Sequence, residues 1–426
     1  MKGNKGVKGV TRRDFLKATA AGAAGLSIGA LAPFSKAWGQ KPIKIGFVSI
    51  FSGRMAMLGE TGYNGFILAV DEINAKGGLL GKKMEVIRRD SAGKIEDAVR
   101  IVRDFVAKDK VDVIFDQSSS REAFAIREVT KDLKMLTFVT ASETAELTGN
   151  PKGWSPFSFR TGDHDVHNSV VAGIYAAQIA KANKWVKWGS ISPDYAYGRD
   201  FTDAFFTILQ MKYPEVKVVT QMWPKLFEPD YTSHITAALN AKPDAMFSAF
   251  WGGDLATFLE QAQMFGFFDQ VKFFGNGIAD YSVLKAVKKV PAGLYTGSRY
   301  LRNVPDTKEN QEFCDKYQKK FGDLPTHWSQ ECYTGVLFME AAAKKAGALE
   351  TEPMIKALEG LTIKAPWGSP PKGTITMRAK DHTPIHYAEA WGMTIANPPY
   401  VKDIQYIDWD TILQHEELIY KKRGWI

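Results

Sequence analysis

The sequence of 426 residues has only two cysteines, Cys314 and Cys332. It holds no CxxC or CxxCH motif and no Cys/His zinc spacing, which excludes the usual cysteine-based redox, haem and zinc sites. A GxGxxG turn after a strand, a P-loop, a GxSxG turn and an HExxH helix are also missing. We therefore expect a protein that is not an enzyme and that carries no resident cofactor or metal.

Strong charge of one sign is missing from most of the chain. The whole sequence has 55 Lys+Arg against 47 Asp+Glu, a net charge of +8. Residues 1–37 hold seven of these bases and one of the acids, so 48 bases and 46 acids remain. That near balance argues against a nucleic-acid partner. No segment after residue 37 is long and apolar enough to span a bilayer.

The excess positive charge lies in an N-terminal segment whose basic stretch, apolar run and cleavage site follow one another as in an export signal. Arg12 and Arg13 follow further lysines and precede an apolar run rich in Ala and Gly at 18–32. Small residues then occupy Ser35 and Ala37, the two positions that a signal peptidase reads. We predict that residues 1–37 are a twin-arginine signal peptide and that the mature protein is periplasmic.

Apolar stretches of strand length alternate with stretches of helical periodicity along the mature chain, which predicts βαβ units and parallel sheets. The mature chain of about 389 residues is longer than a chain that usually folds around a single hydrophobic core, so two lobes are expected. The last third should return to complete both lobes. It contains two helices, a Pro/Gly-rich bend at 365–373 and short strands. The expected strands are 43–49, 84–88, 111–115, 135–139, 185–191, 216–221, 245–250 and 271–274, and the main helices 65–75, 95–108, 121–133, 166–182, 201–212, 231–240, 255–265, 307–321 and 329–345.

Ligands of open parallel sheets lie beyond the carboxyl ends of the strands, so the loops that follow strands are the candidate site. Two consecutive strands of lobe one lead into small, hydroxyl-rich loops that suit a carboxylate. N-capping of the next helix is the alternative for either loop, but two such loops favour binding. The candidates are Ser118, Ser119, Ala141, Ser142, Glu143 and Thr144.

The second lobe offers a smaller set of candidates. Tyr197 precedes a helix and could face the cleft as an apolar wall with a polar tip. Trp251, Asp254 and Asn276 follow the next two strands of that lobe. His164 and His167 have the spacing of a metal pair, but without further ligands nearby in the sequence we predict a solvated helix start.

An ordered set of short motifs resembles the branched-chain amino acid type of substrate-binding protein. These are type I periplasmic binding proteins that feed ABC transporters. The resemblance covers residues 42–360 and is weakest after about residue 365. The motifs that carry it are 45–49 with Ser52-Gly53 and Gly59, Asp71-Glu72-Ile73-Asn74-Ala75-Lys76-Gly77-Gly78 with Gly81, Ser118-Ser119, Glu146-Leu147-Thr148 and Asp194-Tyr195-Ala196-Tyr197-Gly198.

The resemblance implies an α/β fold of two doubly wound parallel-sheet lobes joined by a multi-strand hinge. Lobe one would hold residues 42–161 plus about 298–365, and lobe two 162–297 plus about 366–426. The implied function is capture of a small carboxylate by hinge closure and its delivery to a membrane ABC permease, with the protein acting as a monomer.

The resemblance also assigns roles within the site. Ser118 and the backbone at Ala141 would hold the carboxylate, and Tyr197 would close from the second lobe. Glu143 or Thr144 falls where the family often has a threonine. Asn276 stands near the place where amino-acid binders carry an acid for the ammonium group. An aromatic or aliphatic acid without an amino group therefore competes with an α-amino acid as the ligand.

Three alternatives stay open at this point. An exported enzyme and a ligand-sensing domain of the same fold are other functions of such a chain, although the missing motifs argue against the first. The pairing of Cys314 with Cys332 is also open. An oxidising compartment permits a disulfide, whereas folding in a reducing cytoplasm before export argues against one.

Overall fold

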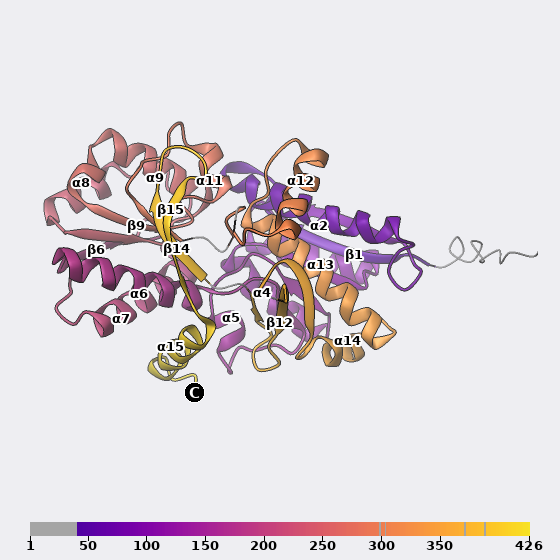
Figure 1. Cartoon of the computed structure of the whole chain (residues 1–426). Helices are drawn as coiled ribbons and strands as arrows, with labels where there is room; N and C mark the ends of the chain where they lie inside the picture. The colour runs from indigo at the N-terminus through magenta and orange to yellow at the C-terminus, as the bar shows by residue number, and fades with distance from the viewer. Residues whose placement is uncertain (1–40, 298–299, 303, 370–371, 387–388) are drawn as a thin grey trace, which may run out of the picture. The chain divides into compact units, whose positions relative to one another are not determined.

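The computed structural model describes residues 41–426 except 298–299, 303, 370–371 and 387–388. Residues 1–37, the expected signal peptide, lie outside the described part. Two sheets organise the rest, and we call the parts built on them lobe one and lobe two (Figure 1). Among the described residues, no helix combines the length and the apolar character needed to cross a bilayer.

Lobe one is built on a five-stranded sheet with the order β2-β1-β3-β4-β5, in which every pair is parallel. Its strands are β1 (Ile43–Ser49), β2 (Met84–Asp90), β3 (Val113–Gln117), β4 (Thr137–Val139) and β5 (Ser158–Arg160). The connecting helices are η1 (Gly53–Met55), α2 (Ala56–Ala75), α3 (Ile95–Asp104), η2 (Phe105–Asp109), α4 (Ser120–Asp132) and α5 (Glu146–Gly149).

Lobe two is built on a seven-stranded sheet with the order β15-β14-β10-β9-β8-β6-β7. Strands β6 to β10 run parallel, whereas β14 and β15 are antiparallel additions at one edge. The strands are β6 (Lys187–Ile191), β7 (Lys217–Met222), β8 (Ala245–Ser248), β9 (Lys272–Asn276), β10 (Tyr295–Gly297), β14 (Glu389–Thr394) and β15 (Val401–Ile407). The helices are α6 (Asp165–Asn183), α7 (Ala196–Lys212), α8 (Thr232–Ala241), α9 (Gly252–Met264), α10 (Phe267–Gln270), α11 (Tyr281–Ala286) and α15 (Trp409–Lys422).

The remaining elements of the last third belong mostly to lobe one. They are α12 (Lys308–Phe321), α13 (His327–Ala346), α14 (Thr351–Leu358), β11 (Thr362–Ser369), β12 (Thr374–Met377) and β13 (Pro384–Ile385), of which the strands form a small separate sheet. Helix α13 packs along α2, although the two are far apart in the sequence (Figure 1). A Cβ on Gly65 would lie 2.0 Å from the Ser329 carbonyl oxygen, so glycine is what lets these helices approach.

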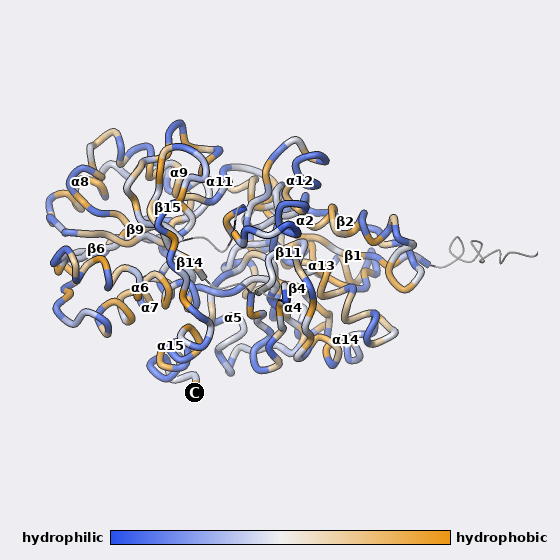
Figure 2. The backbone as a smooth tube through the Cα atoms, viewed as in Figure 1, coloured by the Kyte–Doolittle hydropathy of each residue, from blue (hydrophilic) through white to orange (hydrophobic). Residues whose placement is uncertain are grey.

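Apolar residues line the interiors of both lobes. Figure 2 shows orange residues concentrated along the strands and on some turns of the helices, while many connecting loops are blue. Phe47, Phe115 and Phe138 are fully buried in lobe one, and Trp188 and Phe273 in lobe two. These cores hold the carboxyl ends of the strands in place, and with them the loops that follow.

The alternation predicted from the sequence is confirmed, and most boundaries agree within a few residues. The helix expected at 65–75 starts earlier, at Ala56. The bend expected at 365–373 is wrong in part, because β11 continues to Ser369 with a register shift between Lys364 and Ser369. The lobe boundaries stay a prediction, but Trp367 and Met377 lie in the core of lobe one, beyond the expected return to lobe two at about residue 366.

Both cysteines are buried free thiols in this structure. The Cys314 sulfur lies 3.2 Å from the Tyr300 hydroxyl oxygen, and Cys332 donates to the Gln117 side-chain oxygen at 3.0 Å. Burial raises the pKa of both thiols. Two sulfurs with separate partners in the core argue for reduced cysteines, as folding before export would leave them.

The predicted solvated helix start at His164 and His167 is wrong. Both imidazoles are fully buried, because α15 packs over them and brings Glu416 to 3.2 and 2.8 Å from their Nε2 atoms. Arg378 donates to both carboxylate oxygens of Glu416, at 2.9 and 3.0 Å. A cation at this cluster would lie beside a guanidinium group, so the arrangement favours a buried hydrogen-bonded ion pair over a metal site.

Candidate functional site

A cleft between the two lobes collects the loops that follow the strands. It is lined from lobe one by the loops after β3 and β4, and from lobe two by the loops after β6, β8 and β9. The start of α13 adds further residues. The empty space among these atoms is about 560 Å³, part of it open to solvent. The room that a water-sized sphere finds in it is only about 40 Å³, so the cleft is narrow.

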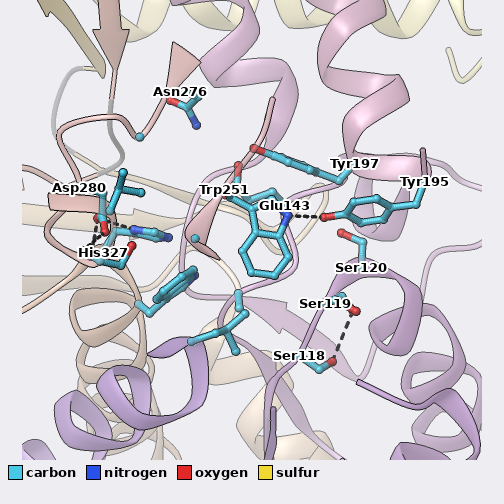
Figure 3. A pocket seen from close by; sticks show the side chains of 17 residues that line it. Ser118, Ser119, Ser120, Glu143, Tyr195, Tyr197, Trp251, Asn276, Asp280 and His327 are labelled. Carbon is cyan, nitrogen blue, oxygen red and sulfur yellow. Dashed lines mark hydrogen bonds and ion pairs between the residues drawn. The ribbon is translucent and has the colours of Figure 1, made fainter. Parts of the chain in front are cut away.

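Seven of the ten residues predicted for the site line this cleft. They come from both lobes, as the position of the strand ends requires, and Figure 3 shows the side chains of six of them with labels. The seven are Ser118, Ser119, Ala141, Glu143, Tyr197, Trp251 and Asn276.

The other three predicted residues lie close by but do not line the cleft. The Ser142 hydroxyl donates to the Ser120 hydroxyl oxygen at 3.2 Å. The Thr144 hydroxyl donates to Asp200 at 2.6 Å, on the first turns of α7. Asp254 accepts from the backbone N–H of Phe227 at 2.8 Å. These three side chains hold the surrounding loops together.

A buried arginine holds the loop that follows β4. Arg160, at the end of β5, is 1% exposed. Its guanidinium donates to the backbone carbonyls of Ser142 and Thr144 and to the Thr148 hydroxyl, the last at 2.8 Å. Burial lowers the pKa of Arg160 and the charge of Asp165 opposes that effect. The loop that presents Ala141 and Glu143 to the cleft is therefore held from behind.

The serine loop after β3 starts helix α4. Ser119 is the N-cap residue, and with Glu122 it forms a capping box. Its hydroxyl donates to the Glu122 carboxylate at 2.9 Å. The N-capping alternative thus holds for Ser119. The Ser118 hydroxyl donates to Asp116, the residue two positions earlier at the end of β3.

Aromatic side chains form the wall contributed by lobe two. The Trp251 indole N–H donates to the Tyr195 hydroxyl at 2.8 Å, and the Tyr195 and Tyr197 rings lie 5.9 Å apart. Trp328 of α13 meets Trp251 edge-on at 6.0 Å. The Tyr195, Tyr197 and Trp251 rings lie between the serine loop and Asn276, which are at opposite sides of the cleft in Figure 3.

Asn276 carries a buried polar atom that faces the cleft. Its side chain is 6% exposed, and its Oδ1 accepts no hydrogen bond from any described residue. Buried acceptors without a partner are uncommon and costly. The atom is thus suited to accept from a hydroxyl or an amino group of a ligand.

The charged side chains at the cleft are acidic residues and one histidine. Asp280, the N-cap of α11, lies 2.6 Å from the Nδ1 atom of His327. Burial would raise the pKa of Asp280, but the charge and hydrogen bond of His327 lower it. Glu143 lines the same cleft. Among the described lining residues there is no lysine or arginine.

The sequence prediction missed several lining residues. Ser120 extends the serine triplet and could have been found by the same rule. Tyr195 entered the sequence analysis only as part of the motif at 194–198, and Asp280 was not among the candidates. His327 and Trp328 begin a helix rather than follow a strand, so no signal in the sequence pointed to them.

Comparisons with known proteins agree with this geometry. The family described as periplasmic binding protein matches residues 42–395, and a twin-arginine translocation signal sequence matches residues 9–29. A Leu/Ile/Val-binding protein homolog of Brucella abortus is 26% identical over 337 residues, which cover 76% of this chain and 82% of the relative.

Solved structures extend the likeness to the fold. An ABC transporter substrate-binding protein from Sphaerobacter thermophilus superposes with a TM-score of 0.74 at 25% identity, covering 86% of this chain and 97% of the other. An ABC transporter solute-binding protein from Rhodopseudomonas palustris, in complex with 3,4-dihydroxybenzoic acid, gives a TM-score of 0.75 at 24% identity. That likeness covers 85% of this chain and 98% of the other.

Proposed function

Because the chain belongs to the periplasmic binding protein family, we propose that it is the extracytoplasmic receptor of an ABC importer. It captures a small organic carboxylate between its lobes and delivers it to a membrane permease by hinge closure. It acts as a monomer and by binding rather than by catalysis. The twin-arginine signal and the family place the protein in the periplasm.

One observation carries this proposal. The Ser118–Ser120 turn, which opens α4, and Ala141 from lobe one meet Tyr197 and Trp251 from lobe two in a single cleft. Backbone N–H groups at a helix start together with serine hydroxyls suit a carboxylate. The aromatic rings suit the apolar body of the same ligand. The fold and the cleft thus supply both halves of a receptor for a small amphipathic acid.

Loss of the Ser118 hydroxyl should weaken binding without weakening the fold. We expect Ser118→Ala to raise the Kd about tenfold, because one hydrogen bond to a charged group contributes roughly 1.5–3 kcal/mol. Tyr197→Ala should also raise it, by removal of an apolar wall. Ser142→Ala is the matched control, since this neighbouring serine does not line the cleft. Calorimetry with L-leucine, 4-methylpentanoate and 4-hydroxybenzoate measures these affinities. Equal losses for Ser118→Ala and the control would refute the assignment.

The charge of the cleft favours an α-amino acid as the ligand. Asp280 is paired with His327, and Glu143 is a second acid among the lining residues. An ammonium group buried in the cleft needs such a partner. The sequence-based doubt rested on Asn276 standing where an acid was expected, and Glu143 supplies a carboxylate from the other lobe instead. The Leu/Ile/Val-binding relative agrees with this ligand class.

An aromatic acid without an amino group is the second candidate. It is favoured by the open Oδ1 of Asn276, which lies across the cleft from the serine loop and would accept from a ring hydroxyl. The neighbour that binds 3,4-dihydroxybenzoic acid has this chemistry.

Glu143→Gln separates the two ligand classes. If Glu143 holds an ammonium group, the variant should bind L-leucine at least about tenfold more weakly, as expected for the loss of a charge-assisted hydrogen bond. Its affinity for 4-methylpentanoate, the same chain without the amino group, should be unchanged or higher. Calorimetry with this matched pair makes the comparison. Unchanged leucine binding together with tight 4-hydroxybenzoate binding would select the second candidate.

A further inference from the structure

The Ser118 hydroxyl has a competing acceptor directly behind it. A serine hydroxyl has one proton to donate, and in this structure it is directed to the Oδ1 atom of Asp116, with the Ser119 carbonyl oxygen as a more distant acceptor at 3.5 Å. Ser118 is completely buried, yet it lines the cleft. With its proton directed to Asp116, the hydroxyl presents only lone pairs to a ligand carboxylate, which is a repulsive arrangement.

Asp116 is placed where an ionised carboxylate is poorly stabilised. Its side chain is 1% exposed, and its Oδ2 accepts no hydrogen bond from any described residue. No lysine, arginine or histidine of the described chain forms an ion pair with it. The charged neighbour that acts on it is Glu122 of α4, another buried acid, which is itself bonded to Ser91 and Ser119.

A proton on Asp116 reverses the direction of this hydrogen bond. Protonated at Oδ1, Asp116 donates to the Ser118 oxygen, and the Ser118 proton is free to point into the cleft. We propose that Asp116 is a positioning residue that must hold a proton when the cleft accepts a carboxylate, so that ligand capture takes up one proton from solvent. This inference rests on the proposed function of the cleft.

The electrostatic surroundings place this proton near neutral pH. Burial raises the pKa of Asp116 to about 7, and the charge of Glu122 also raises it, whereas the hydrogen bonds from the Ser118 hydroxyl and the Ser118 backbone N–H lower it. Above that pH, Asp116 is mostly ionised in the ligand-free protein, so it must take up a proton from solvent when the ligand binds. The affinity for a carboxylate should then fall by about tenfold for each pH unit above 7.

The protonation of Asp116 is tested first without any ligand. A folded-state pKa raised above the unfolded value makes the folded protein lose stability as pH rises from about 4 to about 7, after which the loss is complete. Asp116→Asn lacks this titration and donates to Ser118 through its amide. The variant should therefore melt higher than wild type at pH 8, with the difference shrinking toward pH 4. Asp132→Asn, an exposed acid on α4, is the control. A pH-independent difference would overturn the inference.

The coupling to ligand is tested by calorimetry at pH 8 in two buffers of different ionisation enthalpy. The probes are L-leucine and 4-hydroxybenzoate, whichever binds more tightly. Wild type should take up about 0.9 proton per ligand at pH 8 and about 0.1 at pH 6, as a pKa near 7 requires. Asp116→Asn should take up none and should bind with an affinity that does not vary with pH.

The outcomes separate this inference from the proposed function. Tight binding of a probe with no proton uptake by wild type would refute the role of Asp116 and leave the receptor function standing. If neither probe nor any other small carboxylate binds, the proposed function fails, while the ligand-free titration still reports whether Asp116 holds its proton. Proton uptake that persists in Asp116→Asn would assign the effect to another group and overturn the inference.

Discussion

Arg160→Met is expected to lower the free energy of unfolding by about 3–5 kcal/mol, the usual effect of removing one partner from a buried charged network. Arg160 is 1% exposed, and its guanidinium donates hydrogen bonds to the carbonyls of Ser142 and Thr144 and to the Thr148 hydroxyl. Methionine fills a similar volume but donates nothing, so buried acceptors lose their partner. Urea denaturation monitored by tryptophan fluorescence measures the loss.

The same substitution should weaken ligand binding, because the loop behind Ala141 and Glu143 loses its anchor. Arg127→Met is the matched control. Arg127 is also largely buried, but it donates to one backbone carbonyl, that of Leu147 at 3.2 Å. Its other partner is the exposed carboxylate of Glu128. We expect a clearly smaller loss of stability and little change in Kd for the control. Comparable losses in the two variants would show that Arg160 has no special role in holding the site loop.

Replacing Arg12 and Arg13 together by lysine should abolish export. The double variant keeps the charge of the signal but removes the guanidinium pair that the twin-arginine translocase reads, so the precursor should accumulate in the cytoplasm. Fractionation followed by immunoblotting measures the periplasmic share. Lys5→Arg with Lys8→Arg is the control, since it alters the same segment without touching the pair. Normal periplasmic yield of the double variant would contradict twin-arginine export.

Local patterns were sufficient to predict the fold. Hydrophobic periodicity depends on neighbours in the sequence, and it placed β1 at Ile43–Ser49, the parallel strands β2 to β4 of lobe one and the parallel strands β6 to β9 of lobe two. The same pattern did not predict the parallel strands β5 and β10 or the antiparallel strands β14 and β15 of lobe two. The two antiparallel strands pair with each other, but they join the sheet through β10, which lies far away in the sequence. In β15 only Val401 is buried, so that strand shows no regular alternation.

The loops of the site were easier to find than the directions of their side chains. Seven predicted residues line the cleft, whereas Ser142, Thr144 and Asp254 turn away to hold other loops. In an irregular loop, such as the one that carries Ser142 and Thr144, no period sets which way a side chain points. The direction is decided by the partners within reach, such as Asp200 for Thr144.

The sequence by itself determined the export signal, the two-lobed α/β architecture and the loops that form the cleft. All of these follow from the order in which residue types succeed one another along the chain. Only the tertiary structure decided which side chains meet: His327 with Asp280, α15 over His164 and His167, and Asp116 behind Ser118 with no basic partner among the described residues. The physical reason is that burial and the charge of spatial neighbours control protonation and hydrogen-bond direction. Those neighbours arrive from distant parts of the chain.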